Sequence, residues 1–405
     1  MSRRRRASSM KPSPERLAGG IERLRVLLLT DEMEVGGTQR QIVHLAKGLD
    51  RRRFDPTVLY FRNRSFFVDD LEAAGVPVIQ VEKRGRVDLR FVHELAARLR
   101  AGRYDVLHCF AFSGELWGAV ARRLLPRAQR PALLSSVRGT YEWYRPLHWR
   151  IKRWVSAQSC AVVANSVAGA AYARERMSLA EDAIDVIYNG VEVPAGAEDA
   201  AQALRRELAG EGEALGLFVG RLVEHKNLPT LLRACALLRE RGVMLRVALA
   251  GDGPLRAQLE EDIRAAGLEG RVRLLGQRSD VAALMRAADF VVLPSLREGL
   301  SNVILEAMMC GKPVIASRAG GNVELVEHDR TGLLFETTSA EALADAMQSL
   351  VEDPARRQRL AEAGRARAEE RYSVPAMVRA YEQRYVEAAA LRGAAAAWSS
   401  RTTLG

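Results

Sequence analysis

The fold is decided by the stretch DFVVLPSLREGLSNVILEAMMCGKPVIAS, residues 289–317. In this stretch an apolar strand is predicted to end at Pro294, a polar loop follows, and a helix begins near Asn302. A second apolar run over residues 313–316 predicts another strand. Two buried strands joined by a helix are typical of a parallel sheet with helices on both faces. This stretch therefore predicts an α/β domain.

The same alternation of apolar runs and amphipathic helices continues on both sides of this stretch. The other predicted strands cover residues 24–30, 56–60, 76–81, 105–109, 132–137, 160–165, 184–188, 215–219, 244–250 and 271–275. We therefore predict two doubly wound, Rossmann-like domains that face each other across a cleft. In such sheets ligands bind at the carboxyl ends of the strands, so both sets of ends should meet at the cleft.

Domain boundaries follow from the same pattern. Residues 194–213 hold no predicted strand, which indicates a linker with a short helix. Ser373 can cap a closing helix, and Val374, Val378, Tyr381 and Tyr385 recur along it at helical spacing. The predicted parts are a disordered basic tail (1–20), an N-terminal domain (21–192), a linker (193–213), a C-terminal domain (214–372), a closing helix (373–390) and a frayed tail (391–405).

The charge of the chain is unevenly distributed. The 405 residues carry a net charge of +11, and 48% of them are apolar, which excludes a disordered or fibrous chain. Residues 1–20 contribute +5, residues 21–192 contribute +7 and residues 193–405 contribute −1. The basic first half therefore predicts an anionic partner on that side. Nucleic acid is not expected, because no nucleic-acid-binding motif appears.

Several features predict a cytoplasmic protein. The basic start MSRRRRASSMKPSPER has no apolar segment behind it, so it does not resemble a signal peptide. No apolar run is long enough to span a membrane. The cysteines form no Cys-x-x-Cys pair and are predicted to be reduced core residues. The histidines lack a metal-binding spacing, so no metal site is predicted.

Two loops are candidates for binding an anionic, hydroxyl-bearing ligand. The loop Glu298–Asn302 precedes a helix, so its backbone N–H groups can bind an anion, and Gly299 allows a ligand to approach. Glu298 and Glu306 can both accept hydrogen bonds from sugar or ribose hydroxyls. The alternative is one Glu favoured by the helix dipole and one solvated Glu.

The second candidate loop lies in LFVGRLVEHKN, residues 217–227. Arg221 and Lys226 follow the predicted strand, where two cations can neutralise a diphosphate. The alternative is an ordinary charged surface turn.

Seven motifs together resemble the family 4 glycosyltransferases, which are retaining nucleotide-sugar enzymes of the GT-B fold. The resemblance covers about residues 22–390. The motifs are GGTQRQ (36–41), NSV (165–167), IYNGVE (187–192), VGRLVEHKN (219–227), AGDGP (250–254), EGLSNVILEAM (298–308) and AGGNVELV (319–326).

The resemblance implies a role for each candidate residue in binding a UDP- or GDP-linked sugar, with no separate cofactor. Arg221 and Lys226 would hold the diphosphate, Gly36 and Gly37 would close over it, and Glu306 would hold the ribose. Glu298 and the backbone of Gly299, Leu300, Ser301 and Asn302 would hold the transferred sugar and phosphate, and Gly276 to Arg278 would frame the base. The closing helix would cross back onto the N-terminal, acceptor-binding domain.

The implied mechanism is retaining transfer without a metal, because no Asp-x-Asp sequence occurs and the cations must meet the leaving diphosphate. Front-face attack assisted by the leaving phosphate is implied, and Glu298 as a covalent nucleophile is the alternative. The chain departs from many relatives at Gln39, where they have Glu, and at Phe110, where they have His. His108 could supply the missing sugar contact or be structural, and Arg138 could meet donor phosphate, an acidic acceptor or only a surface partner.

The acceptor side is less specific. Residues 141–155, YEWYRPLHWRIKRWV, interleave basic and aromatic residues, which predicts contact with an anionic membrane surface. The alternative is that Trp149 and Trp154 pack inward and the cations are solvated. We predict a glycosyltransferase acting on a glycan, lipid-linked or small-molecule acceptor, in the cytoplasm or peripherally on the inner face of the membrane. A nucleotide-sugar epimerase and a non-catalytic nucleotide-sugar-binding subunit are the alternatives.

Overall fold

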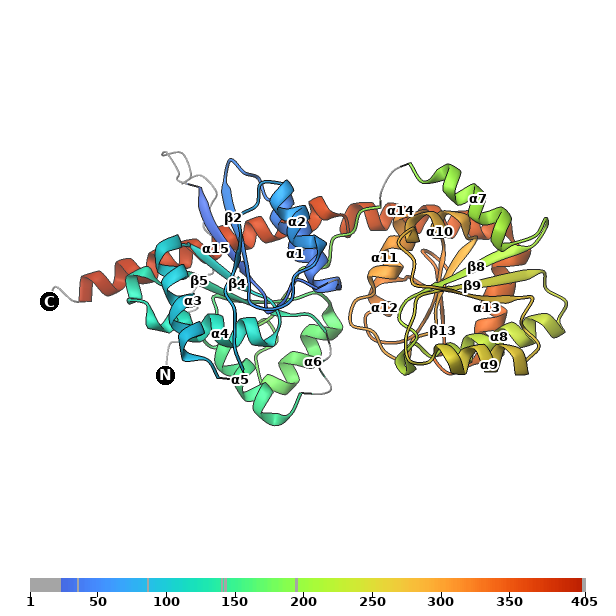
Figure 1. The fold of residues 1–405 in the computed structure, drawn as a ribbon, viewed down its shortest axis with the longest axis horizontal. Helices are drawn as coiled ribbons and strands as arrows, with labels where there is room; N and C mark the ends of the chain where they lie inside the picture. The colour runs from blue at the N-terminus through green and yellow to red at the C-terminus, as the bar shows by residue number, and fades with distance from the viewer. Residues whose placement is uncertain are drawn as a thin grey trace, which may run out of the picture.

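The protein has two domains, each built on one parallel sheet (Figure 1). The computed structural model describes residues 23–402, apart from residues 35, 86, 140, 142–143 and 194–195, and it describes side chains up to residue 392. The predicted basic tail, residues 1–20, lies outside the described residues.

The first domain contains a seven-stranded sheet in the order β3-β2-β1-β4-β5-β6-β7, with all neighbours parallel. Side chains alternate between its faces, so Leu28 packs toward α1 and Leu27 packs toward α3. The strands are β1 (Leu24–Leu29), β2 (Phe54–Tyr60), β3 (Val78–Gln80), β4 (Val106–Cys109), β5 (Ala132–Val137), β6 (Ala161–Ala164) and β7 (Asp185–Val186). The helices are α1 (Gly37–Gly48), α2 (Phe66–Ala73), α3 (Leu89–Gly102), α4 (Phe112–Leu124), α5 (Pro146–Ser156) and α6 (Val167–Met177).

The second domain contains a six-stranded parallel sheet in the order β10-β9-β8-β11-β12-β13. Both sheets are doubly wound, as predicted. The strands are β8 (Ala214–Val219), β9 (Leu245–Ala250), β10 (Val272–Gly276), β11 (Phe290–Leu293), β12 (Val314–Ser317) and β13 (Leu333–Phe335). The helices are α7 (Glu198–Leu208), α8 (Leu228–Glu240), α9 (Arg256–Ala265), α10 (Val281–Ala287), α11 (Asn302–Met309), α12 (Asn322–Leu325), α13 (Ala340–Glu352) and α14 (Pro354–Arg371).

The chain crosses between the domains twice, and the two crossings lie side by side. Val191 N donates to Tyr372 O at 2.8 Å, and Val191 forms a bridge with Ser373. Beyond this point α15 (Val374–Thr402) runs back along the first domain (Figure 1). Its residues Met377, Val378, Tyr381, Tyr385 and Ala388 join the core that α1, α2 and the first sheet share. The last helix is therefore a structural part of the first domain.

The structure differs from the prediction in two connecting regions. Residues 193–213 were predicted as a linker with a short helix, and α7 is that helix; what was not predicted is that it packs on α10 and buries Leu208 in the core of the second domain. Arg205 of α7 also donates to Asp289 at 2.5 Å. Residues 391–402, predicted to be frayed, continue α15.

Two smaller predictions also need correction. Strand β13, Leu333–Phe335, was absent from the predicted set. Cys160 is exposed rather than in the core, whereas Cys109 and Cys235 are buried; none of the four cysteines is in a disulfide.

Candidate active site

The loop Glu298–Asn302, which we call the anion loop, joins the carboxyl end of β11 to α11. Ser301 caps α11, because its Oγ accepts from the backbone N–H of Ile304 at 3.4 Å. The backbone N–H groups of residues 299–302 donate to no acceptor within the described chain. They therefore form a site at the N-terminus of α11 that favours an anion.

A glycine pair from the motif at residues 319–326 fixes this loop. A Cβ at Gly320 would lie 2.0 Å from Glu298 O, and a Cβ at Gly321 would lie 1.8 Å from Gly299 O. No side chain fits at these distances, so glycine is required for the two backbones to approach each other.

Lys226 and Glu298 contact each other beside the anion loop. Lys226 ends a 3-10 turn, Glu224–Lys226, and its Nζ donates to Glu298 Oε1 at 2.6 Å. Ser295 Oγ donates to the same oxygen at 2.7 Å. Asn227 holds the turn against β11, because its Nδ2 donates to Pro294 O at 3.1 Å. Lys226 and Glu298 both lie near the edge of the second sheet that faces the cleft. A ligand there could replace either residue as the partner of the other.

The other predicted donor residues of this domain lie around the same edge. Arg221 is exposed, and its side chain forms no ion pair with the described residues. Gly276 ends β10 with a φ of 70°, a conformation that favours glycine. Arg278 is occupied by Asp280, to which it donates twice, at 2.8 and 2.6 Å. Because the Arg278 side chain is bound to Asp280, the predicted contact of Arg278 with the base would be made by its backbone.

Glu306 faces the first domain. Its Oε1 accepts from Arg40 Nη1 at 3.0 Å, which joins α11 to α1. Burial raises the pKa of Glu306, and the Arg40 guanidinium opposes that effect only in part. Gly36 precedes α1 and Gly37 begins it. A Cβ at Gly37 would lie 3.3 Å from Asn302 Nδ2, so the glycine pair lies next to the anion loop across the cleft.

A carboxylate also ties the two domains together. Glu324 on α12 accepts from the backbone N–H groups of Val167 and Ala168, each at 2.7 Å. These two groups open α6 in the first domain, where the helix dipole favours a negative charge. This contact links the two domains at one side of the anion loop.

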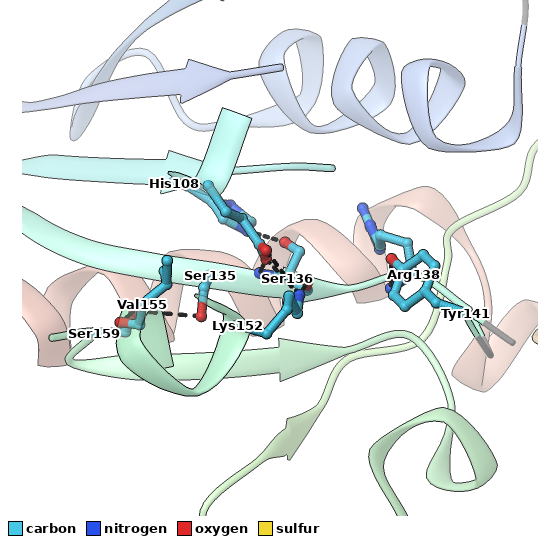
Figure 2. Close-up of polar contacts among 9 residues, drawn as sticks. His108, Ser135, Ser136, Arg138, Tyr141, Lys152, Val155 and Ser159 are labelled. Carbon is cyan, nitrogen blue, oxygen red and sulfur yellow. Dashed lines mark hydrogen bonds and ion pairs between the residues drawn. The ribbon is translucent and has the colours of Figure 1, made fainter. Parts of the chain in front are cut away.

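His108 does not reach the cleft, which corrects its predicted contact with a sugar or acceptor. The residue is completely buried. Its Nδ1 lies 2.7 Å from Tyr385 OH. Its Nε2 lies 2.9 Å from Ser136 Oγ (Figure 2). Burial lowers the pKa of His108 well below its usual value, so the ring is neutral. The sequence could not show this, because Tyr385 comes from α15, far along the chain.

A buried ion pair lies in the same part of the first domain. Lys152 Nζ donates to both carboxylate oxygens of Glu115, at 2.9 and 2.8 Å, and to Ser136 O at 2.7 Å. The two side chains are 4% and 1% exposed. Burial raises the pKa of Glu115, and Lys152 opposes that effect. Lys152 is therefore no part of the basic surface that residues 141–155 were predicted to form.

The first domain holds a cavity of about 380 Å³ beside α1. Tyr144 stacks between Tyr141 and the ring of His148, at centroid distances of 4.5 and 5.1 Å. Asp31 lies where β1 ends, and burial raises its pKa. The lining residues are Asp31, Thr38, Ala111, Phe112, Arg138, Tyr141, Tyr144 and His148.

This cavity was missed in the sequence, because its residues come from separate loops and helices that share no motif. Asp31 could have been identified as a candidate from the sequence, since it directly follows a predicted strand. Ala111 adds a second sign of function, because its φ of 60° is unfavourable for a residue with a Cβ. A larger cavity, of about 470 Å³, lies beside Asp289 and Lys312 at the opposite edge of the second sheet, away from the anion loop.

Arg138 lies at the end of β5, between the cavity and the anion loop. Its guanidinium lies over the ring of Phe110, with the Cζ atom 5.0 Å from the ring centroid. Its Nη1 donates to Asn189 Oδ1 at 3.2 Å, and its Nε and Nη2 are buried without a partner in the described chain. Gly139 follows it, and a Cβ at Gly299 would lie 3.3 Å from Gly139 Cα. The first domain therefore contacts the anion loop at this point.

Neither a metal site nor a membrane span is found among the described residues. They include no cluster of three or more His, Cys, Asp or Glu side chains that could hold a metal ion. This part of the chain also includes no helix that is long and apolar enough to cross a membrane.

Comparison with known proteins identifies the family. The model "Glycosyl transferases group 1" matches residues 200–367, and "Glycosyltransferase Family 4" matches residues 35–193. The chain is 31% identical over 293 residues to D-inositol 3-phosphate glycosyltransferase of Pseudarthrobacter chlorophenolicus, with 69% of this chain and 70% of the relative covered. The chain belongs to the family 4 glycosyltransferases. It is therefore a glycosyltransferase enzyme.

Other members of this glycosyltransferase family support the assignment. The 2-deoxystreptamine glucosyltransferase of Streptomyces kanamyceticus is 28% identical over 303 residues, covering 70% of this chain and 73% of the relative. The crystal structure of Anabaena Alr3699/HepE in complex with UDP superposes with a TM-score of 0.79 at 26% identity, over 90% of this chain and all of that chain. A complex of the same Anabaena protein with UDP-glucose gives a TM-score of 0.76. The two-sheet architecture is the GT-B fold.

Proposed function

We propose that this glycosyltransferase moves a hexose-type unit from a UDP- or GDP-linked sugar to an acceptor hydroxyl, with retention and without a metal. The observation that carries the proposal is the Lys226–Glu298 pair beside the free N–H groups of the anion loop. A diphosphate can replace Glu298 as the partner of Lys226, and the backbone N–H groups of the anion loop can bind the phosphate oxygens. The Anabaena relative, which binds UDP and UDP-glucose, supports a nucleotide donor.

The surrounding residues suggest how the donor lies. Arg221 would meet the diphosphate from the exposed side, and Gly36 and Gly37 would approach it from the first domain. Glu306 would accept from the ribose hydroxyls in place of Arg40. The backbone near Gly276 would frame the base.

The proposed reaction proceeds on one face of the sugar. The bond between the anomeric carbon and the diphosphate oxygen breaks, and the bond to the acceptor oxygen forms on the same face. The acceptor proton passes to the leaving phosphate, while Lys226, Arg221 and the N-terminus of α11 stabilise its charge. No side chain forms a covalent bond in this scheme.

The aromatic cavity of the first domain is our proposed acceptor site. It lies beside α1 and Arg138, and both of these elements contact residues of the anion loop or of α11. His148 offers a flat face for a sugar ring, the stacked rings of Tyr141 and Tyr144 line the cavity beside it, and Asp31 can accept from a hydroxyl. We propose a glycan or other polyhydroxylated acceptor, either free or carried by a lipid.

Contact with an anionic membrane is a further part of the proposal. Helix α5 buries Trp149, but it exposes Leu147 (62%) and Trp154 (37%) together with Arg150 and Arg153. Such a face favours an anionic lipid surface. We expect binding to vesicles that contain phosphatidylglycerol, and we expect the double variant R150E/R153E to lose it. Equal binding to purely zwitterionic vesicles would contradict this part.

The reaction itself is tested by following nucleotide release and product stereochemistry. We expect the protein to release UDP or GDP from a nucleotide sugar in the presence of EDTA. NMR of the product should show the anomeric configuration of the donor. Inversion of that configuration, or complete loss of activity in EDTA, would contradict the proposed mechanism.

A further inference from the structure

Three polar side chains form a chain that crosses from the first domain to the anion loop. Arg138 Nη1 donates to Asn189 Oδ1 at 3.2 Å, and Asn189 Nδ2 donates to Asn302 Oδ1 at 2.9 Å. Asn189 is 5% exposed, so water does not compete for its amide. Asn302 is the last residue of the anion loop and the first of α11.

The chemistry of Arg138 fixes the direction of every bond in this chain. A guanidinium donates hydrogen bonds and accepts none, so the amide of Asn189 must turn its oxygen toward Arg138. Its nitrogen then faces Asn302, which must present its own oxygen in return. Asn302 Nδ2 is left facing away from Asn189, near Gly37, where a Cβ would lie 3.3 Å from this nitrogen. The positive charge of Arg138 thus determines that Asn302 presents a hydrogen-bond donor, rather than an acceptor, on the side near Gly37.

Contacts on two sides hold Arg138 in place. Its guanidinium lies over Phe110, and its backbone N–H donates to Tyr141 OH at 2.8 Å. Its guanidinium donates to Asn189 Oδ1 at 3.2 Å and also lies beside the hydroxyl of the buried Tyr381. Replacement of the guanidinium would free Asn189 to turn over.

We propose that Arg138 and Asn189 are positioning residues, which orient the Asn302 amide so that its N–H groups face the donor diphosphate. This inference rests on the proposed function, because it takes the anion loop to be the donor site. In this proposal Arg138 and Asn189 of the first domain determine whether Asn302 of the second domain presents a hydrogen-bond donor or an acceptor to the ligand.

The proposal predicts an unusual order of effects at position 189. In Asn189→Asp the carboxylate only accepts, so it keeps Arg138 but draws Nδ2 of Asn302 toward itself. The oxygen of Asn302 then faces the diphosphate, and UDP binding should weaken by about tenfold or more. Asn189→Ala leaves the Asn302 amide free to turn, so it should weaken binding less. A purely structural role predicts the reverse order, because the aspartate keeps the size and the arginine contact.

The test is the dissociation constant of UDP or GDP measured by calorimetry on the full chain. In an Asn302→Ala background, adding Asn189→Asp should cause no further loss of affinity. Asn302→Asp, which leaves the first domain untouched, should weaken binding on its own. Gln158→Glu adds one negative charge to the same domain just beyond the distant end of α5, and it should have no effect. Thermal unfolding identifies any variant that fails to fold, and Asn302→Asp then decides the question.

The outcomes separate this inference from the proposed function. If wild-type protein binds UDP or GDP, Lys226→Ala weakens binding and both Asn189→Asp and Asn302→Asp bind like wild type, the orientation proposal is overturned and the donor site stands. If Asn189→Ala binds more weakly than Asn189→Asp, the role is structural and the proposal is also overturned. If wild-type protein binds neither nucleotide, the donor site falls and this inference falls with it.

Discussion

Each domain holds a lysine–glutamate pair, and the two pairs lie in different surroundings. Glu115 and Lys152 are sealed in the first domain, at 1% and 4% exposure. Lys226 and Glu298 lie at the cleft edge of the second sheet, at 14% and 12%. The buried pair joins α4 to α5 and accepts from the backbone of β5, so it cannot exchange partners. The pair at the cleft adjoins unpaired backbone N–H groups, so an anionic ligand can replace one member.

The comparison shows that the same two residue types serve different purposes in the two sheets. In the first domain the pair fixes α5, and α5 carries His148 at the wall of the aromatic cavity. In the second domain the pair is part of the proposed donor site. Mutations should therefore separate stability from activity.

The largest expected effect is on the stability of the first domain. Glu115→Ala leaves Lys152 buried and unpaired, which should lower the free energy of unfolding by about 3–5 kcal/mol. Urea denaturation measures this change. The double variant E115L/K152M should recover most of the loss, because it leaves no buried charge. A loss below about 1 kcal/mol in Glu115→Ala would contradict the structural role of the pair.

The next largest effect is on catalysis in the second domain. Lys226→Ala should lower kcat/KM about 10²- to 10³-fold, because it removes a cation that stabilises the leaving diphosphate. Steady-state kinetics with a nucleotide sugar measures this effect. The matched control is Lys312→Ala, because Lys312 belongs to the same domain but lies at the opposite edge of the second sheet, away from the anion loop. Equal kinetics in the two variants would remove Lys226 from the mechanism.

A smaller effect is expected at the aromatic cavity. Tyr144→Ala should raise the KM for the acceptor by up to about tenfold, because it breaks the aromatic stack that supports His148 at the cavity wall. The affinity for the donor should stay unchanged, since the proposed donor site does not include Tyr144. Calorimetry with UDP checks the donor and kinetics with varied acceptor checks the KM. A loss of UDP affinity in this variant would show that the cavity is not a separate acceptor site.

The smallest effect concerns pH. Burial raises the pKa of Glu306, so its carboxylate takes up a proton at a higher pH than an exposed Glu does. Donor affinity should be full above this raised pKa and fall as the pH drops through it. Arg40→Ala removes the cation that lowers this pKa, so the fall should begin at higher pH. In Glu306→Gln this pH dependence should disappear, and its persistence would point to another group.

The contrast between the domains also explains what the sequence could predict. The anion loop, Lys226 and the strand–helix–strand unit at residues 289–317 lie in continuous motifs, so their placement follows from local pattern. The aromatic cavity combines Asp31, Phe112 and Tyr144 from three separate segments of the chain, and no local pattern links them. The sequence therefore indicates the proposed donor site but not the proposed acceptor site.

Long-range packing accounts for the remaining differences. His108 follows the strand-end pattern, yet Tyr385 of α15 covers it. Helix α7 lies in a stretch with linker composition, yet Leu208 and Arg205 dock it on the second domain. Asn189 lies in a motif that the family resemblance includes, but its partners Arg138 and Asn302 come from both domains. In each case the decisive contact joins residues far apart in the chain.

The most direct test of the central claim is nucleotide release by wild-type protein and Lys226→Ala, measured in EDTA with a panel of nucleotide sugars and polyhydroxylated acceptors. We expect wild-type protein to release UDP or GDP with at least one donor, and the folded Lys226→Ala variant to release it about 10²- to 10³-fold more slowly. No release from any nucleotide sugar that calorimetry shows to bind, or equal release by both proteins, would contradict the account.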